Sequence, residues 1–199
     1  MRLFLAVDLD EATRVAVSEI AVTLRAMLHP AVARSTTWVA AANLHITLRF
    51  LGETRDEAAA ALRLALDRPV RLAPFEVKVG AVGTFPNAAA PRILWVGVRR
   101  GGALLEELYN EVQARLTELG VPPEPRPFHP HVTLARFKRD RIPRRARLPN
   151  WAAEASEPIA PMLVTELTLF ESCMSSRGST YVAQLRTPLV RGEGQGTRG

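Results

Sequence analysis

The chain has 199 residues, a formal net charge of +6 and a pI near 10.6. Its hydrophobic content of 47% is sufficient for a packed core, and no apolar run approaches the ~20 residues that would span a membrane. The single cysteine, Cys173, excludes an intramolecular disulfide and a cysteine metal cluster.

The same composition indicates a compartment and a kind of partner. One cysteine is typical of a reducing interior, and the first residues do not have the layout of a signal peptide, so we expect a cytoplasmic protein. The basic excess favours an acidic partner, with RNA as the natural candidate. Nearly all of that excess is arginine, however, which a GC-rich genome would also produce.

Strands and helices are predicted to alternate in the first third of the chain. Residues 2–7 form an apolar run typical of a central strand. Asp10 is a candidate N-cap for a helix over residues 11–28, which the sequence His29-Pro30 ends. Residues 36–39 form a short extended segment.

The remaining elements follow the same reasoning. Thr54 and Glu57 have capping-box spacing and predict a helix that continues to about residue 66. We expect strands over 75–85, 92–99, 162–173 and 180–187, and a helix over 103–119 that Gly120 ends.

Two short segments share the pattern His, apolar residue, Thr, Leu. The first motif is residues 45–48 and the second is residues 131–134. Both lie in β-prone runs, and side chains alternate between the faces of a strand. Strict alternation therefore places His45, Thr47 and Arg49 on one face, with Phe50 on the other.

The second motif follows the same rule. His131 and Thr133 share a face, and strict alternation places Arg136 on the opposite, core face. A single His-x-Thr usually marks a surface histidine or a satisfied core histidine. Two copies on two predicted strands of one short chain favour a joint function instead.

Two imidazoles and two hydroxyls facing each other suit a particular chemistry. Imidazole titrates near neutral pH, so one ring can accept a proton while the other donates one. Threonine hydroxyls can donate to phosphoryl oxygens, and an arginine adds a planar fork for phosphate. The combination indicates attack at phosphorus without a metal.

The chain resembles the two-histidine (2H) phosphoesterase superfamily, on residues 1–7, 43–53 and 128–136. Within it, the chain is most similar to the RNA 2',3'-cyclic phosphodiesterases, also called 2'-5' RNA ligase-like proteins. The resemblance implies an α+β fold with two pseudo-symmetric lobes of antiparallel sheet, helices on the outside and a central cleft. It covers residues 1–187 as one bilobal domain, and residues 188–199 are expected to be a disordered tail.

The resemblance also implies a reaction and roles. The expected reaction is hydrolysis of a 2',3'-cyclic phosphate on RNA or a nucleotide to the 2'-phosphomonoester, by a monomer, without cofactor or metal. His131 is the expected base and His45 the expected acid, and Thr47 and Thr133 would hold the non-bridging oxygens. Arg136 would contact phosphate, which requires a bend after Leu134.

Other side chains are candidates for supporting roles. Phe50, Phe4 and Trp38 are candidates for stacking on a nucleobase, although each is also suited to the core. His129 is expected to orient the second motif strand or to bind a surface phosphate. The basic residues of 136–147 would form either a phosphate-tracking loop or a solvated loop.

Three alternative functions remain open at this point. The same histidines could join RNA ends through a 2'-5' linkage, the reverse chemistry. A basic RNA-binding module without turnover fits the charge but does not need matched titrating groups. A metal hydrolase is disfavoured because ligand spacings such as His-x-Glu-x-x-His are absent.

Overall fold

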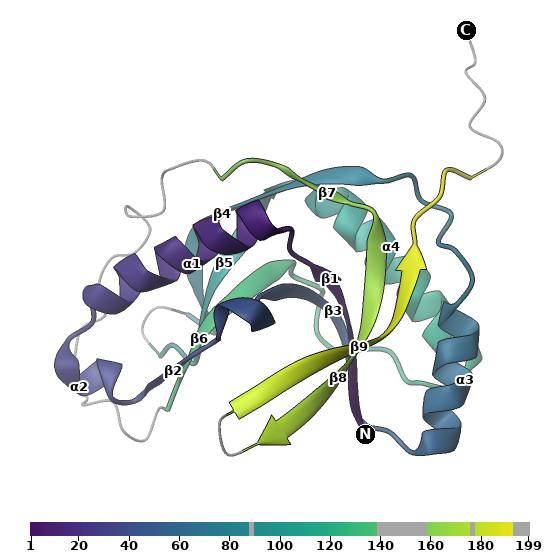
Figure 1. Ribbon diagram of the computed structural model, residues 1–199, viewed down its shortest axis with the longest axis horizontal. Coiled ribbons are helices and arrows are strands. Elements are labelled where there is room, and N and C mark those ends of the chain that lie inside the picture. The colour runs from purple at the N-terminus through teal and green to yellow at the C-terminus, as the bar shows by residue number, and fades with distance from the viewer. Residues whose placement is uncertain (88–89, 139–158, 176–177, 193–199) are drawn as a thin grey trace, which may run out of the picture.

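The computed structural model describes residues 1–87, 90–138, 159–175 and 178–192 (Figure 1). Most of the basic stretch over 136–147 lies outside the described residues. Over the described residues the elements are β1 (Arg2–Asp8), α1 (Glu11–Ala26), α2 (Pro30–Ala33), β2 (Thr36–Trp38), a 3-10 turn (Ala41–Asn43), β3 (His45–Glu53), α3 (Asp56–Leu66), β4 (Phe75–Phe85), β5 (Ile93–Arg100), α4 (Gly102–Glu118), β6 (His131–Phe137), β7 (Met162–Val164), β8 (Glu166–Ser175) and β9 (Gly178–Pro188).

The described strands form a nine-stranded sheet in the order β7-β4-β5-β6-β3-β1-β8-β9, with β2 paired to β6. All neighbours in this order run antiparallel. One half contains β1, β3, β8 and β9, and the other contains β4 to β7 with β2. The halves join where Ile46 of β3 pairs with Val132 of β6. The predicted α+β fold with two antiparallel halves is therefore confirmed, as two parts of one curled sheet.

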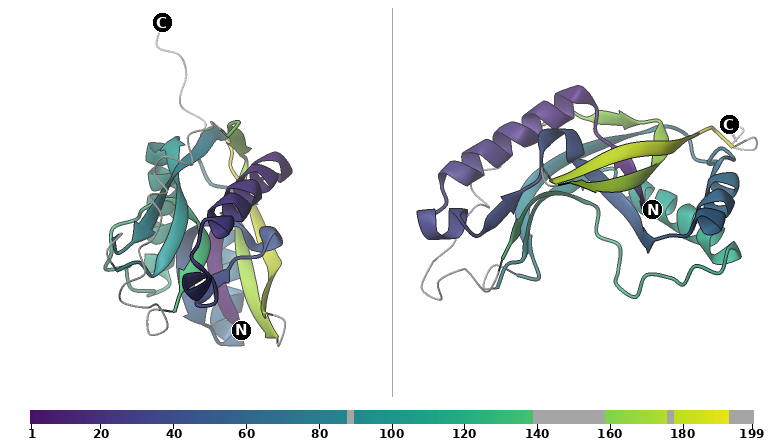
Figure 2. Two further views of the ribbon diagram at one scale, coloured as in Figure 1. Left: turned by 90° about the vertical axis from the view of Figure 1, so that its left-hand side faces the viewer. Right: turned by 60° about the horizontal axis from the view of Figure 1, so that its bottom comes forward.

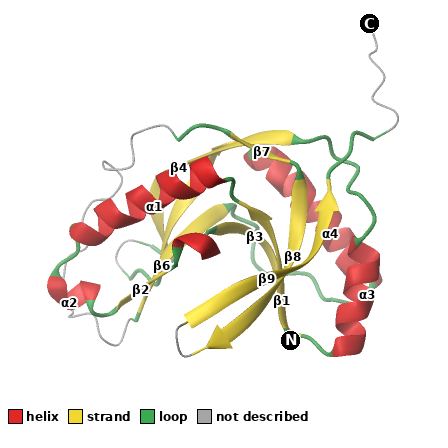
Figure 3. Ribbon diagram, in the orientation of Figure 1, coloured by secondary structure: helices red, strands yellow, loops and turns green. Residues whose placement is uncertain are grey.

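Each half contains the same three-element unit. In the first half β1 leads into α1, and the chain returns as β3 beside β1. In the second half β5 leads into α4, and the chain returns as β6 beside β5. The helices lie on the outside of the curled sheet (Figures 2 and 3). The motif strand is the returning strand in both halves, as the order of predicted elements indicated.

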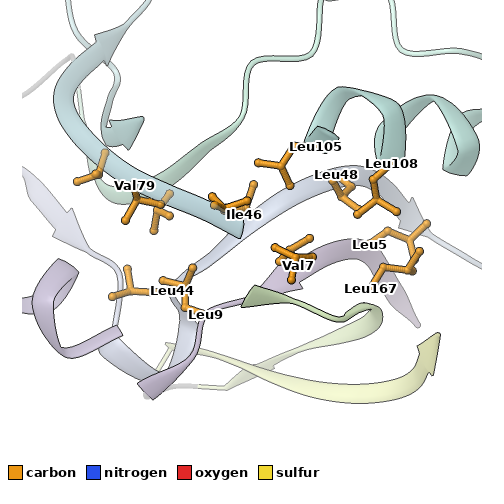
Figure 4. Packing of buried hydrophobic residues seen from close by; sticks show 14 of the residues in the cluster. Leu5, Val7, Leu9, Leu44, Ile46, Leu48, Val79, Leu105, Leu108 and Leu167 are labelled. Carbon is orange, nitrogen blue, oxygen red and sulfur yellow. The ribbon is translucent and has the colours of Figure 1, made fainter. Parts of the chain in front are cut away.

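Alternating apolar residues of the strands form the core between the sheet and its helices. Leu5 and Val7 of β1 and Ile46 of β3 are fully buried. Leu105 and Leu108 of α4, three residues apart on one helical face, pack against this layer (Figure 4). Both motif strands are therefore held by their apolar face, and the opposite face of each strand carries its histidine.

Local capping differs from prediction at two helices. Asp10 caps α1 as predicted, because its Oδ1 accepts from the backbone N–H of Thr13 at 2.8 Å. The predicted capping box at Thr54 is wrong: its hydroxyl donates to Gly52 O, and Arg55 precedes α3 without a side-chain cap. His29, which had no predicted role, accepts from the N–H of Ala31 and caps α2.

The predicted strand over residues 162–173 is two strands. β7 pairs with β4 in the second half, and β8 pairs with β1 in the first. Thr165 lies between them, where the chain crosses from one half to the other. The buried apolar positions change from Met162 and Val164 to Leu167 and Leu169 across this crossing, a break in alternation that the prediction of one strand did not take into account.

The ordered fold continues beyond residue 187, the expected end of the domain. Leu189 is 4% exposed, and its N–H donates to Thr165 O at 2.8 Å. Val190 N–H donates to Val70 O at 2.9 Å. The expected tail boundary was therefore placed too early, because apolar Leu189 and Val190 complete a contact that lies far away in the sequence. Residues 193–199 lie outside the described residues.

A β-bulge interrupts β3 at the last residue of the first motif. Leu5 of β1 pairs with Arg49, but the next residue, Ala6, pairs with Thr47. Leu48 is the extra residue, so the alternation of faces reverses after it.

The second motif has a bulge at the same position. Leu94 of β5 pairs with Ala135, but Trp95 pairs with Thr133. Leu134 is the extra residue of β6, two residues after the Val132 that pairs with β3. The bend that Arg136 required after Leu134 is thus present.

The bulges correct three predicted orientations. Arg49 was expected beside His45 but is only 8% exposed and lies on the core side. Phe50 was expected on the core face but is 56% exposed. Arg136, which strict alternation placed in the core, is also exposed. Phe50 and Arg136 therefore occupy equivalent positions, five residues after the two motif histidines.

Among the residues that the structure describes, no helix is both long enough and apolar enough to cross a membrane. The longest described helices are α4 with 17 residues and α1 with 16 residues.

Arg49→Met should destabilise the fold rather than remove a phosphate contact. Arg49 donates to Glu124 Oε2 at 2.6 Å and to Pro122 O at 2.5 Å. Loss of these bonds leaves Glu124, itself 29% exposed, with only the longer contact between its Oε1 and Arg126 at 3.7 Å. We expect a loss of about 2–3 kcal/mol in the free energy of unfolding, measured with urea.

The matched control is Arg186→Met, which removes the more exposed ion pair with Glu166. This change should cost less than about 1 kcal/mol. Equal costs for the two variants would contradict the role of Arg49 as a buried tether of the 122–124 segment.

Candidate active site

The first motif holds His45 in a defined tautomer. Nδ1 of His45 lies 2.7 Å from Asn43 O, and a carbonyl oxygen only accepts, so Nδ1 carries the hydrogen. Nε2 lies 2.9 Å from Thr47 Oγ1. In the neutral ring Nε2 therefore accepts from the Thr47 hydroxyl, and it is the atom that can gain a proton.

The second motif repeats the tether of Nδ1. Nδ1 of His131 lies 2.6 Å from His129 O, again a carbonyl two residues earlier in the chain. Nδ1 of His131 is thus the donor, and Nε2 is the atom that exchanges protons. His129 contributes its backbone carbonyl to orienting the imidazole of His131, which differs from both of its predicted roles.

The junction of β3 and β6 brings the two motifs together. The antiparallel register of Ile46 with Val132 places His45 next to Thr133 and Thr47 next to His131. Each histidine thus has a threonine of its own motif on its strand and a threonine of the other motif across the junction. The structure therefore brings the four predicted residues into one site.

Burial and neighbouring charges lower the pKa of both histidines. Burial is the largest cause for His45, followed by opposing contributions from its bond to Asn43 O and from the charge of Asp8, which raise the pKa. The positive charges of His131 and Arg136 lower it further. A protonated His131 thus disfavours protonation of His45, so the two rings are electrostatically coupled.

The pKa of His131 is lowered chiefly by burial, while its bond to His129 O opposes the change. The charges of His129 and Arg136 lower it further. Arg136 thus acts on both catalytic candidates, which places its guanidinium charge at the site and supports its predicted position.

Aromatic rings surround His45. The ring of Phe4 lies 4.9 Å from the imidazole, and the Tyr181 ring meets it edge-on at 5.4 Å. Phe50 and Phe170 lie 6.0 and 5.3 Å from Phe4. Phe170 and Tyr181 were not predicted, because they come from β8 and β9 at the other end of the chain.

A second aromatic group surrounds His131. The ring of Phe85 lies 5.1 Å from His131 and 5.0 Å from Trp95. A Cβ on Gly83 would lie 2.2 Å from the indole of Trp95, and a Cβ on Gly97 would lie 2.9 Å from it. The two glycines therefore allow the indole to lie close against the strands, a role that the sequence did not reveal.

Two other predictions concern Trp38 and metal ligands. Trp38 packs against the main hydrophobic core, and its strand pairs with β6 beyond the motif. Its partly buried side chain thus fits the core alternative that was given for it. Within the described part of the chain, no three His, Cys, Asp or Glu side chains form a group that could hold a metal ion.

A curled antiparallel sheet with paired His-x-Thr strands at its junction is the arrangement implied by the 2H phosphoesterase resemblance. The family model described as "2'-5' RNA ligase superfamily" matches residues 12–172. The chain therefore belongs to the 2'-5' RNA ligase superfamily, and the resemblance predicted from the motif segments is confirmed.

Relatives and solved structures match nearly the whole chain. An RNA 2',3'-cyclic phosphodiesterase of Archaeoglobus fulgidus is 35% identical over 91% of this chain and 96% of its own length. The Escherichia coli K12 protein of the same name is 33% identical over 96% and 94%. The crystal structure of E. coli LigT complexed with 3'-AMP has a TM-score of 0.71 at 30% identity and covers 96% of this chain and 98% of LigT. A crystal structure of a Thermus thermophilus protein has a TM-score of 0.73 at 31% identity, covering 97% and 100%.

Removal of the Arg136 charge should raise the pKa of both histidines. In Arg136→Gln the positive charge that lowers both values is lost, so each imidazole should protonate at a higher pH than in the wild type. Imidazole NMR titration measures both values directly. Lys138→Gln removes a charge two residues further along and should leave the pKa values of both histidines unchanged. If Arg136→Gln changed the pKa of only one histidine, the charge of Arg136 would not act on both.

Proposed function

We propose that this chain hydrolyses the 2',3'-cyclic phosphate of an RNA end or nucleotide to a 2'-phosphomonoester. The observation that carries the proposal is the matched pair of imidazoles, each with Nδ1 tethered to a carbonyl and Nε2 available for proton transfer. The names of the relatives, RNA 2',3'-cyclic phosphodiesterase, support the same reaction. One chain supplies both motifs, so the reaction does not need a second copy and the protein is expected to act as a monomer.

His131 is the proposed base. Its lowered pKa keeps Nε2 unprotonated at neutral pH, where it can accept a proton from the attacking water. The water oxygen forms the new bond to phosphorus, and its proton passes to Nε2. The tether from Nδ1 to His129 O holds the ring and stabilises the imidazolium that forms.

His45 is the proposed acid. Its Nε2–H would donate the proton to O3' as the bond between phosphorus and O3' breaks, leaving the phosphate on O2'. When Nε2 is protonated, Thr47 Oγ1 can accept from it, and the Thr47 hydroxyl hydrogen is then free to point at a phosphoryl oxygen. Thr133 would provide the equivalent donor beside the other ring.

Arg136 completes the proposed phosphate site. Its exposed guanidinium acts on both imidazoles and can stabilise the negative charge that grows on the non-bridging oxygens. The proposed scheme uses only side chains of this chain as acid, base and anion-stabilising donors. It therefore predicts turnover in the presence of a chelator.

The second candidate function is the joining of RNA ends through a 2'-5' linkage. It is included because the matching family model is described as a 2'-5' RNA ligase superfamily. The same acid and base serve it by microscopic reversibility. A 5'-hydroxyl would then replace the attacking water beside His131. Water is present at far higher concentration, so hydrolysis should dominate.

His45→Ala and His131→Ala should each lower turnover by roughly 10²–10⁴-fold, because each removes one of the two proton-transfer groups. The assay is product analysis with 2',3'-cyclic AMP and with an RNA oligomer that ends in a cyclic phosphate, in the presence of EDTA. His29→Ala, which removes only the cap of α2, is the matched control. A 3'-phosphate product would reverse the leaving group and the acid and base assignments, and loss of wild-type activity with EDTA would exclude the metal-free scheme.

Phe50→Ala should weaken substrate binding with little effect on turnover at saturation. Phe50 is exposed on the site face beside Phe4, where a nucleobase can stack on its ring. Loss of one stacked base costs about 1–3 kcal/mol, so KM should rise accordingly. Leu64→Ala, which removes an exposed side chain of α3, is the control. An unchanged KM for Phe50→Ala would place the nucleobase elsewhere.

A further inference from the structure

The two motifs alone do not decide which histidine donates the proton. Both imidazoles have the same tautomer, the same type of carbonyl tether and the same position before a bulge. The charge of Arg136 acts on both. A base and an acid must nevertheless differ, so the difference has to come from residues outside the motifs.

Asp8 is the residue directly opposite His45. It ends β1, and its register partner in β3 is His45. Phe4, an even number of residues earlier on β1, contacts the His45 ring, so alternation places Asp8 on the same face. Asp8 therefore brings a carboxylate beside the imidazole.

Arg14 of α1 fixes this carboxylate. Its Nη2 donates to Asp8 Oδ1 at 2.6 Å and to Leu9 O at 2.8 Å. The same oxygen of Asp8 also accepts from the backbone N–H of Leu9 at 3.0 Å. The side chain of Arg14 is 15% exposed and that of Asp8 is 33% exposed, so the pair is partly shielded from solvent.

Arg14 also holds the segment that orients His45. Its Nη1 donates to Ala41 O at 3.1 Å and to Leu44 O at 3.2 Å, at the two ends of the turn that precedes β3. Asn43 in that turn supplies the carbonyl that accepts from His45 Nδ1. One guanidinium therefore fixes both the carboxylate and the tether of the imidazole relative to each other.

The equivalent position in the other half has no side chain. The register partner of His131 in β5 is Gly97, and the indole of Trp95 fills the space that a Cβ there would need. The imidazole of His129 lies near His131, with ring centres 6.3 Å apart. His131 thus faces a glycine where His45 faces a carboxylate.

We propose that Asp8, fixed by Arg14, is a positioning residue that keeps the catalytic proton on His45 and so makes His45 the acid and His131 the base. The inference rests on the proposed function and adds the reason for its two roles. The Asp8 carboxylate stabilises the imidazolium of His45, and His131, which lacks such a partner, remains neutral. His45 Nε2–H then gives its proton to O3' while His131 Nε2 takes one from water, so the protons balance.

Burial lowers the pKa of both rings and is the largest cause for each, but the charges around the two rings differ in a way that favours this assignment. Those acting on the pKa of His45 are Asp8 from β1, which raises it, and His131 and Arg136 from β6, which lower it. Those acting on the pKa of His131 are His129 and Arg136, and both lower it. Tyr181 meets His45 through its ring edge.

Asp8→Asn tests the proposal, because it removes the charge and keeps an oxygen for Leu9 N–H and Arg14. NMR titration should show a lower pKa for His45 and no fall in the pKa of His131. The alkaline limb of the kcat profile for a 2',3'-cyclic nucleotide should move to lower pH, so activity is lost above the optimum and largely recovered below it. Asp8→Glu, which keeps the carboxylate, should restore both the pKa of His45 and the alkaline limb.

Glu11→Gln is the matched control. Glu11 contacts the same guanidinium at 3.8 Å and is highly exposed, so its loss should not change the titration of His45. An unchanged pKa of His45 in Asp8→Asn, or an equal loss of activity at every pH, would overturn the inference. The two proposals can fail separately. If the wild type did not cleave the cyclic phosphate but the pKa of His45 fell in Asp8→Asn, the proposed function would be wrong, and the effect of Asp8 on the protonation of His45 would stand.

Discussion

The antiparallel contact between β3 and β6 is the constraint on which the site depends. Among the described residues, the register pair Ile46 and Val132 joins the two halves of the sheet, and each lies next to a motif histidine. The apolar side chains fill the core, and the histidines and threonines consequently share the opposite face. The contact that closes the fold is therefore also the contact that assembles the chemistry.

An approximate two-fold relation follows from this contact, and it suits displacement at phosphorus, where one group must serve the entering oxygen and another the leaving oxygen. A strict two-fold would make the histidines equivalent, whereas the reaction requires a difference between them. Residues outside the motifs provide it: β1 places Asp8 opposite His45, while β5 places Gly97 opposite His131. The surrounding strands thus differentiate two groups that the motifs make alike.

Most of the fold and the four central residues could be predicted from the sequence, because periodicity, caps and repeated motifs are local properties. The faces of Arg49, Phe50 and Arg136 could not be predicted reliably, because an extra residue in a strand becomes visible only from its pairing partner. Tyr181 and Trp95 were missed for a related reason, since each reaches a histidine through the order of strands in the sheet. Long-range strand pairing is the information that local pattern does not contain.

The order of strands also has a consequence for how the protein is made. β1 precedes the other described strands along the chain, yet one of its two edges pairs with β8, which follows it by more than 150 residues. The ring of Tyr181, on β9, covers His45 only after that hairpin has joined. Such distant pairings are slow to form, because a long loop must close before any contact compensates for its lost entropy. The histidine of the first motif thus acquires these surroundings only after β8 and β9 have been translated.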